Sequence, residues 1–412
     1  MRILLFPIGS AGDVHPFIGI GLALRERGHE VVLSTSAYFE DTARRAGLEF
    51  AGIGTREEFE RTLQDPDLWH PRRAFATVIH KGVEHTYQPI LDVVRERHKP
   101  GDTIVVGATL SLGARTAAEA VGAPYVSVHL APAVFMSSAR PAVFPGMLMG
   151  RWVPRWAYRL QLWLGRRATD AIALPGLNRF RAGIGLPPAL EIIRDWWHAP
   201  GRTIGLFPDW FAPVQPDWPP QTRLTGFVLF DESGRRESPP GLARFLDDGE
   251  PPILFTPGSA MAHGREFFRE AVAACRLLGR RGLLVSRFPE TVPDELPLTI
   301  CHVEYVPFSE IMPRCAALVS HGGIGTCAQA LRAGIPHLVQ HMAHDQPDNA
   351  SRIAELGTGA GIAARRFKAA VVADKLAAML DSAAVRANCR NAASRFTPAR
   401  WLQQTCELIE GA

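Results

Sequence analysis

The glycine-rich segment at positions 320–326 combines residues that suit the binding of an anion. It reads Ser-His-Gly-Gly-Ile-Gly-Thr, follows a short apolar run and precedes a helical pattern. Three glycines let a ligand approach the backbone closely. A helix that begins near Thr326 would turn its free N–H groups and its positive dipole end towards the loop. The pattern predicts a phosphate site with His321 as a hydrogen-bond donor, although the loop alone leaves open a simple turn between a strand and a helix.

Three further motifs surround this loop in the sequence. Tyr-Val-Pro-Phe occupies 305–308, Ala-Gly-Ile-Pro occupies 333–336, and His-Asp-Gln-x-x-Asn occupies 344–349. Together with the loop they resemble the donor signature of nucleotide-sugar glycosyltransferases of the GT-B fold. The resemblance is strongest to the large family that contains plant secondary-product, antibiotic and sterol glycosyltransferases. Tyr305 stands where that signature has a Trp that stacks on the nucleobase, and Phe308 stands where it has Gln.

The resemblance implies a role for each matching residue. The backbone at Val306 would bond the edge of the base, and His321 with the amides after it would hold the diphosphate. Asp345 and Gln346 would bond the sugar hydroxyls, a polar pairing that discriminates well between sugars. A second phosphate loop is expected at 256–259, directly after a strand. The implied donor-binding residues are Gly12, Gly258, Ser259, Tyr305, Val306, His321, Gly322, Gly323, Gly325, Thr326, Asp345 and Gln346.

The loop at 9–16 is where the resemblance places the catalytic base. Many family members carry Gly-His there, whereas this chain has Gly12-Asp13. A carboxylate can act as the base when its pKa is raised towards neutrality. The stretch 107–114, where the His members have an orienting acid, contains no acid here, as expected if Asp13 acts alone. Two alternatives stay open: Asp13 only stabilises the positive end of a helix, or His15 is the base.

A metal site is the competing interpretation of the histidines near the donor motif. His337, His341, His344 and Asp345 lie close in sequence and could suggest zinc. The donor motif already accounts for the last two of these residues, and no D-x-D occurs in a glycosyltransferase context. We therefore expect neither a metal nor a cofactor. The helix end and His321 would instead bring positive charge to the leaving diphosphate.

The segment 151–167 combines tryptophans with five arginines. Trp152, Trp156 and Trp163 follow a helical spacing together with two leucines. A basic, Trp-rich amphipathic helix is a candidate for contact with a membrane surface or with a hydrophobic acceptor. The alternative is a core helix whose arginines extend to solvent.

The remaining sequence supplies the elements that must position these residues. The first fifty residues alternate between apolar runs and helical patterns as β-α-β-α-β, with a helix that starts at Pro16, and the same alternation resumes at 253. Between 130 and 245 the pattern breaks up, and 231–240 is typical of an exposed linker. We predict an α/β protein of GT-B type with two Rossmann-like domains. The expected parts are an acceptor-binding domain at 1–225, a linker at 226–240, a nucleotide-sugar-binding domain at 241–390, and a helix at 391–412 that packs back on the first domain.

Composition narrows the classes of function and location. The 412 residues include 45 basic and 41 acidic side chains, a net charge of +4, which argues against a nucleic-acid partner. The six cysteines show no C-x-x-C spacing, which favours a reducing compartment. No apolar window is long enough to span a membrane. The expected location is the cytoplasm, with a candidate peripheral contact at the inner face of the membrane. The oligomeric state stays open.

The resemblance extends over the whole chain and is closest to the catalytic subunit of bacterial rhamnosyltransferases that make mono-rhamnolipids. The stretches that carry it lie at 8–14, 65–69, 206–213, 217–219 and 225–227. It implies an inverting, metal-independent hexosyltransferase that moves rhamnose or glucose from a dTDP- or UDP-linked sugar to a hydroxyl of a lipid-like acceptor, with Asp13 as base. The alternatives are a natural-product O-glycosyltransferase (for a macrolide, sterol, carotenoid or phenol) that uses UDP-glucose, a nucleotide-sugar epimerase or hydrolase, and an inactive auxiliary subunit.

Overall fold

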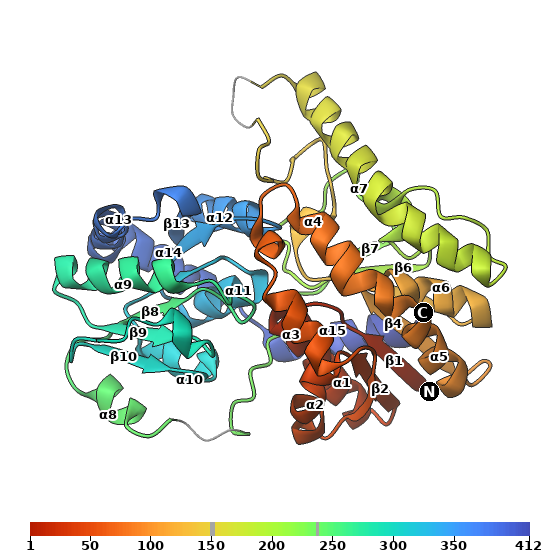
Figure 1. Ribbon diagram of the computed structural model, residues 1–412, viewed down its shortest axis with the longest axis horizontal. Helices are drawn as coiled ribbons and strands as arrows, with labels where there is room; N and C mark the ends of the chain where they lie inside the picture. The colour runs from red at the N-terminus through yellow and green to blue at the C-terminus, as the bar shows by residue number, and fades with distance from the viewer. Residues whose placement is uncertain (149–152, 236–238) are drawn as a thin grey trace. The chain divides into compact units, whose positions relative to one another are not determined.

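The computed structural model describes residues 1–148, 153–235 and 239–412 (Figure 1). The chain forms two compact units. Unit 1 contains Met1–Phe230 and Thr397–Ala412, and unit 2 contains Asp231–Phe396. Each unit is a parallel β-sheet with helices packed on both faces, which confirms the predicted α/β class with two Rossmann-like domains.

The sheet of unit 1 has seven parallel strands in the order β3-β2-β1-β4-β5-β6-β7. Its central strands are apolar along their whole length because both faces are covered. Along β1, Ile3 and Leu5 face one core cluster, and Leu4 and Phe6 face the other. The strand order reverses between β1 and β4, and this switch point is where ligands bind in open α/β sheets. The strands are β1 (Arg2–Phe6), β2 (Glu30–Thr35), β3 (Glu49–Gly52), β4 (Thr103–Ala108), β5 (Tyr125–His129), β6 (Arg202–Gly205) and β7 (Thr222–Leu224).

Helices on the two faces of this sheet complete unit 1. The first cluster lies under α1, α2 and α15, and the second lies under α5, α6 and α7. The helices are α1 (Ala11–Glu26), α2 (Glu40–Ala46), α3 (Arg56–Leu63), α4 (Ala74–Thr77), α5 (Tyr87–Arg97), α6 (Leu112–Val121), α7 (Arg155–Gly183) and α15 (Pro398–Glu410). Short helical turns are η1 (Ala37–Phe39), η2 (Pro66–Trp69), η3 (Val78–Val83), η4 (Glu84–Thr86), η5 (Pro132–Val134) and η6 (Ile192–Trp196).

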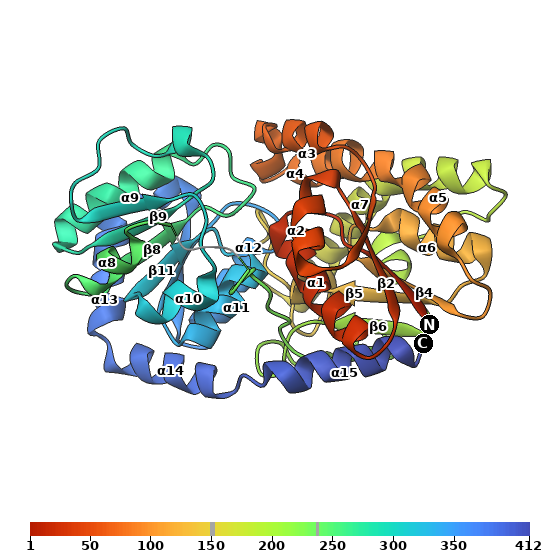
Figure 2. The ribbon, with the colours of Figure 1, turned by 90° about the horizontal axis from the view of Figure 1, so that it is seen from below.

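The last helix packs on unit 1 (Figure 2). Arg27 makes two bonds to the Glu410 carboxylate, at 2.6 and 2.7 Å. Trp401 lies against Gly226, where an added Cβ would come within 2.1 Å of the indole. Cys406 and Ile409 complete the apolar anchor in the first core cluster. The helix that belongs to unit 1 begins at Pro398, and α14 before it stays in unit 2.

Two helices of unit 1 differ from the prediction. The first starts at Ala11 instead of Pro16, because Ser10 and Asp13 form a capping box that stabilises an earlier first turn and leaves Pro16 inside the helix. The second, α7, runs for 29 residues through the region where the sequence pattern breaks up. Pro175 lies inside it, and its buried face includes the polar residues Asp170 and Arg181, so no continuous apolar stripe marks its length.

The sheet of unit 2 has six parallel strands in the order β10-β9-β8-β11-β12-β13, and its switch point lies between β8 and β11. The strands are β8 (Ile253–Thr256), β9 (Gly282–Val285), β10 (Ile300–Val303), β11 (Ala317–Ser320), β12 (His337–His341) and β13 (Gly359–Ala363). The helices are α8 (Leu242–Asp247), α9 (Arg265–Leu278), α10 (Phe308–Ile311), α11 (Ile324–Ala333), α12 (Gln346–Glu355), α13 (Ala369–Asp381) and α14 (Ala383–Ser394). The short turns are η7 (Pro289–Thr291), η8 (Met312–Arg314) and η9 (Ala364–Arg366).

Candidate active site

The predicted phosphate loop of unit 2 joins the buried strand β11 to helix α11. The helix begins at Ile324, two residues before the expected start, with Gly323 as its N-cap and no side chain that caps it. Ser320 fixes the loop: its hydroxyl accepts a bond from the Gly322 N–H at 3.1 Å and lies 2.8 Å from His337 Nε2. The first-turn amides of an α-helix have no partner within the helix. These amides and the positive end of the helix dipole are groups that can bind an anion.

The glycines of this site surround the His321 imidazole. A Cβ added at Gly258 would lie 2.5 Å from His321 Cε1, and one added at Gly323 would lie 2.6 Å from Nε2. At Gly322, φ is +87° and a Cβ would lie 2.3 Å from a Val339 methyl. All three positions therefore require glycine. Because Thr256 pairs with Ser320 across the switch point, the two predicted phosphate loops lie side by side.

The protonation of His321 differs from the expectation that it brings charge to the site. Burial, with a smaller contribution from His344, lowers the pKa of His321 to about 4. Burial and the nearby His321 lower the pKa of His337 to about 3. At neutral pH both imidazoles are neutral. His321 can therefore donate one N–H bond to a phosphate oxygen, and the positive field comes from the end of α11.

The start of α12 holds the predicted sugar-binding residues. The Gln346 side-chain oxygen accepts the N–H groups of Met342, at 2.8 Å, and Ala343, at 3.1 Å. Asn349 donates to Asp345 Oδ2 at 2.8 Å and to the Gly322 carbonyl at 2.9 Å, so it ties this loop to the phosphate loop. The sequence motif contained Asn349, but no role was assigned to it. Its position four residues after Asp345, on the same helix face, was the available signal.

His344 adopts an unusual backbone conformation directly before Asp345. Its φ is +56°, and Glu232 is the other non-glycine residue with positive φ in the described chain. Such conformations cost free energy and are concentrated at functional sites. Burial raises the pKa of the Asp345 carboxyl. The strained turn and the desolvated carboxyl are the kind of features that ligand-binding loops have.

Tyr305 is held by a residue that the sequence assigned to an exposed linker. Its hydroxyl donates to the Asp231 carbonyl at 2.7 Å. The Asp231 carboxylate accepts the Ser309 N–H at 2.7 Å and the Ser309 hydroxyl at 3.1 Å, which fixes the start of α10. Asp231 is half-buried and Glu232 is buried, so the predicted exposure of this stretch is wrong at its first two positions, while 236–238 lie outside the described residues. The Val306 side chain is buried in the core, which leaves its backbone for ligand contacts.

The predicted base of unit 1 lies in the first turn of α1, at the switch point beside β4. Asp13 Oδ2 accepts the Ser10 N–H at 2.7 Å and the Ser10 hydroxyl at 3.1 Å. Gly9, with φ +135°, leaves space for that oxygen, because a Cβ there would lie 2.3 Å from it. His15 makes an edge contact with the Phe230 ring, with the ring centroids 5.7 Å apart. The capping role of Asp13 is therefore present, through Oδ2.

The neighbouring strand ends contain a histidine that sequence reasoning missed. His129 ends β5, and its Nδ1 lies 2.8 Å from the Thr109 hydroxyl, just beyond β4. Burial and the nearby His198 hold the pKa of His129 well below its usual range. A histidine at the end of an otherwise apolar strand was the available signal. This neutral side chain contributes a hydrogen-bonding group to the same edge of the sheet as Asp13.

Known proteins match both units. Residues 3–137 match the glycosyltransferase family 28 N-terminal domain, and residues 287–408 match the erythromycin biosynthesis protein CIII-like C-terminal domain. Over its full length, the chain is 36% identical to the O-mycaminosyltylonolide 6-deoxyallosyltransferase of Streptomyces fradiae, with 97% of that protein covered. The chain belongs to the antibiotic-type family of nucleotide-sugar glycosyltransferases. It is accordingly a hexosyltransferase.

Solved structures confirm the GT-B fold of this glycosyltransferase. The glycotransferase of kitacinnamycin superposes with a TM-score of 0.75 at 18% identity, covering 100% of this chain and 98% of that one. The spinosyn rhamnosyltransferase SpnG, complexed with thymidine diphosphate, superposes with a TM-score of 0.69 at 17% identity, covering 100% and 99%.

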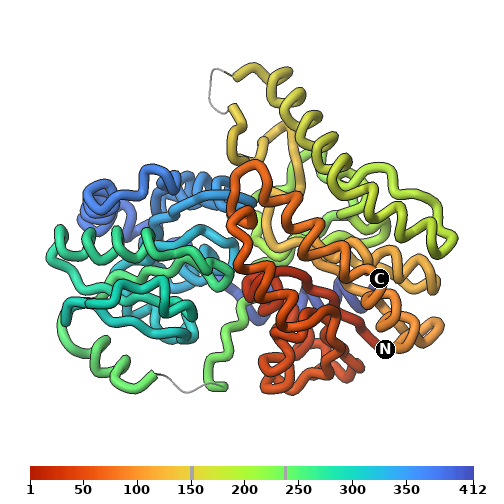
Figure 3. Tube along the Cα trace, viewed as in Figure 1, coloured from red at the N-terminus to blue at the C-terminus, as the bar shows by residue number. Residues whose placement is uncertain are grey.

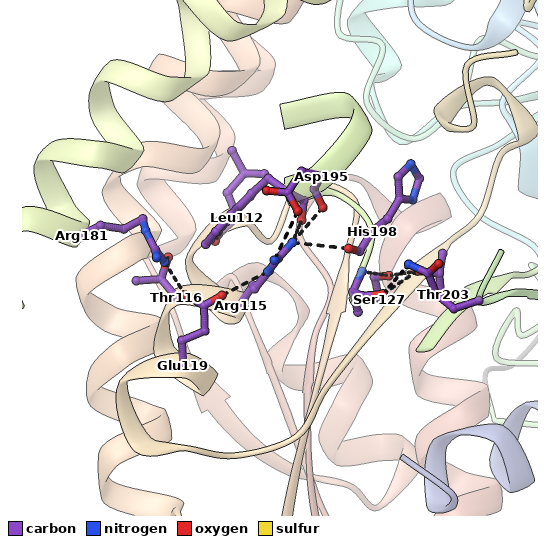
Figure 4. Close-up of polar contacts among 12 residues, drawn as sticks. Leu112, Arg115, Thr116, Glu119, Ser127, Arg181, Asp195, His198 and Thr203 are labelled. Atoms are coloured by element: carbon purple, nitrogen blue, oxygen red, sulfur yellow. Dashed lines mark hydrogen bonds and ion pairs between the residues drawn. The ribbon is translucent and has the colours of Figure 1, made fainter. Parts of the chain in front are cut away.

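The tryptophans of the glycosyltransferase differ in their exposure. Trp196 is buried between the guanidinium groups of Arg115 and Arg181, each 4.4 Å from a ring centroid. Arg115 also donates to the Asp195 carbonyl at 2.8 Å, in a polar network that secures η6 (Figure 4). In contrast, Trp156 is 67% exposed and Trp163 is 45% exposed.

These exposures bear on the predicted acceptor-binding residues. For Trp156 and Trp163, the alternative of a core helix is wrong, because both side chains lie on the surface of α7. Trp152, the third predicted acceptor residue, lies outside the described residues. In the described part of the chain, no group of three or more His, Cys, Asp and Glu side chains is arranged to hold a metal ion. His337, from the considered zinc cluster, instead bonds Ser320.

Proposed function

We propose that this enzyme transfers a 6-deoxyhexose such as rhamnose from a thymidine-diphosphate (TDP) sugar to a hydroxyl of a hydrophobic acceptor, with inversion and with Asp13 as base. The part of the proposal that concerns donor binding rests on one observation. Two glycine-containing loops pack around His321 at the switch point of unit 2. Two similar proteins support the choice of donor. The 36% identical relative is a 6-deoxyallosyltransferase, and the spinosyn rhamnosyltransferase was solved with thymidine diphosphate.

The donor diphosphate would lie at the start of α11. Backbone amides and the helix dipole stabilise charge without reorganising, and their effect is greatest where charge develops in the transition state. The negative charge on the diphosphate grows as the bond to the sugar breaks. His321, neutral at rest, donates one further bond. The amino end of α11 would therefore supply the stabilisation of the leaving group.

The sugar would contact Asp345 and Gln346 at the start of α12. Gln346 Oε1 is already occupied by two backbone N–H groups, and Asp345 Oδ2 accepts a bond from Asn349. Each side chain is thus held in one orientation before the ligand arrives. Fixed polar groups discriminate between sugars, because a mismatched hydroxyl leaves them unpaired.

Asp13 would take the proton of the acceptor hydroxyl. The acceptor oxygen forms a bond to the anomeric carbon, the bond from that carbon to the diphosphate oxygen breaks, and the proton passes to the carboxylate. Ser10 orients the side chain through Oδ2.

The acceptor has two candidate classes. The relative named for O-mycaminosyltylonolide favours a macrolide-like acceptor. The stretches at 8–14 and 206–213, which resemble rhamnolipid rhamnosyltransferases, favour a hydroxylated fatty acid. A mass-spectrometric assay tests both, with TDP-rhamnose or UDP-glucose and a panel containing a macrolide aglycone and a 3-hydroxy fatty acid. A product whose mass increases by one deoxyhexose, made from the TDP sugar alone, supports the proposal. Consumption of the donor without an acceptor product would indicate a hydrolase or epimerase instead.

A further inference from the structure

We propose that the amino-terminal half of α7 docks unit 1 on the surface of an anionic lipid bilayer. The docking face consists of four exposed apolar side chains and four arginines. Its members are Trp156, Leu160, Trp163, Leu164, Arg155, Arg159, Arg166 and Arg167. The inference does not depend on which acceptor the enzyme uses, because it concerns the location of the protein.

The apolar side chains of the docking face lie on one side of the helix. Trp156, Leu160 and Leu164 are spaced by four residues, with Trp163 beside them, and residues at this spacing are neighbours on a helix surface. Their exposed fractions are 67%, 46%, 52% and 45% respectively. Ten large apolar side chains are exposed in the described chain, and five of them fall within positions 148–164. The exposed apolar surface is therefore concentrated here.

The fifth of these side chains, Leu148, is held beside the same helix. Its N–H donates to Gln161 Oε1 at 2.7 Å, and Gln161 Nε2 donates back to the Leu148 carbonyl at 3.3 Å. Leu148 is 68% exposed. These two bonds fix an additional apolar side chain next to the docking face.

The two halves of α7 have different environments. In the carboxyl-terminal half, Ala173 and Leu177 are fully buried in the second core cluster of unit 1. The amino-terminal half extends clear of the other helices of that unit (Figures 1 and 3). The helix is therefore anchored at one end, and at the other it presents the apolar side chains of the docking face to solvent.

The charged side chains in the sequence around the docking face all have one sign. Positions 120–169 contain six arginines and no acidic residue. Among the described residues, no carboxylate forms an ion pair with the four arginines of the docking face. The Arg167 guanidinium instead lies 5.7 Å from the centre of the Trp163 ring. Such a surface is complementary to a uniformly negative one.

A lipid surface explains the combination of exposed tryptophans, leucines and arginines better than a protein surface does. Tryptophan favours the boundary between headgroups and acyl chains, and basic amphipathic helices lie in that boundary when anionic lipids are present. A second copy of the chain, docked symmetrically through this face, would place arginines against arginines. No helix among the described residues has the length and apolarity to cross a bilayer, so the contact would be peripheral.

Flotation of the full-length enzyme with vesicles tests the proposal. The vesicles contain either phosphatidylcholine alone or an equimolar mixture with phosphatidylglycerol. We expect binding to the anionic vesicles to be at least about tenfold tighter, because each basic residue near the surface adds attraction. Added salt should weaken binding. A blue shift of tryptophan fluorescence should accompany it.

Matched variants assign the binding to the docking face. Trp156→Ser with Trp163→Ser, and separately Arg155→Gln with Arg159→Gln, should each reduce vesicle binding about tenfold or more. Leu298→Ser, which alters a fully exposed leucine of unit 2, should leave it unchanged. Thermal unfolding and TDP binding of all variants check that they fold.

Three results would overturn the inference. They are equal binding to both vesicle types, full binding by the double Trp variant, or a monomer–dimer change in that variant with no effect on vesicles, which would assign the face to a second copy. Because TDP binding is measured separately, failure of the membrane proposal is distinguishable from failure of the proposed transfer reaction.

Discussion

The two switch points of this glycosyltransferase share one architecture and use it differently. In each unit a buried strand leads through glycine-containing backbone into a helix at the point where the strand order reverses. In unit 2, helix α11 has Gly323 as its N-cap and no side-chain cap, so its first-turn amides are available to an anion. In unit 1, helix α1 carries its own carboxylate, Asp13, in its first turn. The same positive helix end can thus hold a ligand diphosphate or orient a catalytic carboxylate, depending on which residue fills it.

Replacement of Asp13 should produce the largest effect, because it removes the group unique to the unit 1 switch point. Asp13→Asn keeps the shape and should lower kcat by about 10²–10⁴-fold, the usual contribution of a general base, while TDP binding is unchanged. Steady-state kinetics with TDP-rhamnose measure this effect.

Two control variants accompany Asp13→Asn. Ser10→Ala weakens the capping box but leaves the carboxylate, so it should cost far less activity. His15→Ala should retain most turnover. If Ser10→Ala and Asp13→Asn were equally impaired, Asp13 would be only a helix cap, and a dead His15→Ala enzyme would make His15 the base.

Filling the space beside His321 should have the next largest effect. This effect should be confined to the affinity for the donor. Gly323 has an ordinary negative φ of −59°, so Gly323→Ala adds a clash with the imidazole and no backbone strain. We expect TDP binding to weaken by about ten- to a hundredfold, as for overpacking of a tight site. Gly183→Ala is the matched control, because a Cβ there meets nothing within 4 Å. Unchanged TDP affinity in Gly323→Ala would show that the diphosphate lies elsewhere.

His321 should contribute little to the pH dependence of donor binding. Its pKa is about 4 and a histidine with an ordinary pKa titrates near 6.5, so His321 stays neutral at pH 6 and above. His321→Gln should weaken TDP binding by about tenfold, for one lost bond to a charged group. The ratio of the wild-type affinity for TDP to that of His321→Gln should stay constant from about pH 6 to 8. A ratio that falls as pH rises through this range would indicate a charged imidazole.

The smallest effect is expected from the Tyr305 hydroxyl. Tyr305→Phe retains the ring for stacking and loses the bond to the Asp231 carbonyl, worth about 1 kcal/mol net. The melting temperature of unit 2 should fall by about 2–4 °C, with little change in KM for the donor. Calorimetry and kinetics together measure this. A large rise in KM with unchanged melting would assign the hydroxyl to the ligand.

Local sequence patterns predicted the positions that local chemistry controls. The alternation of strands and helices that resumes at 253, and the glycine-rich loop, follow from apolar runs and glycines close together in the chain. The early start of α1 was missed because a Pro inside a helix is usually read as its beginning. The role of Asp231 was missed because its partners lie more than seventy residues away.

Titration calorimetry of TDP against the wild type, Asp13→Asn and Gly323→Ala tests the central claim most directly. The account predicts that the wild type and Asp13→Asn bind TDP with the same affinity, that Gly323→Ala binds it at least about tenfold more weakly, and that UDP binds no more tightly than TDP. Failure of TDP to bind the wild type, or weakened binding in Asp13→Asn with full binding in Gly323→Ala, would contradict the assignment of the diphosphate to unit 2 and of the base to unit 1.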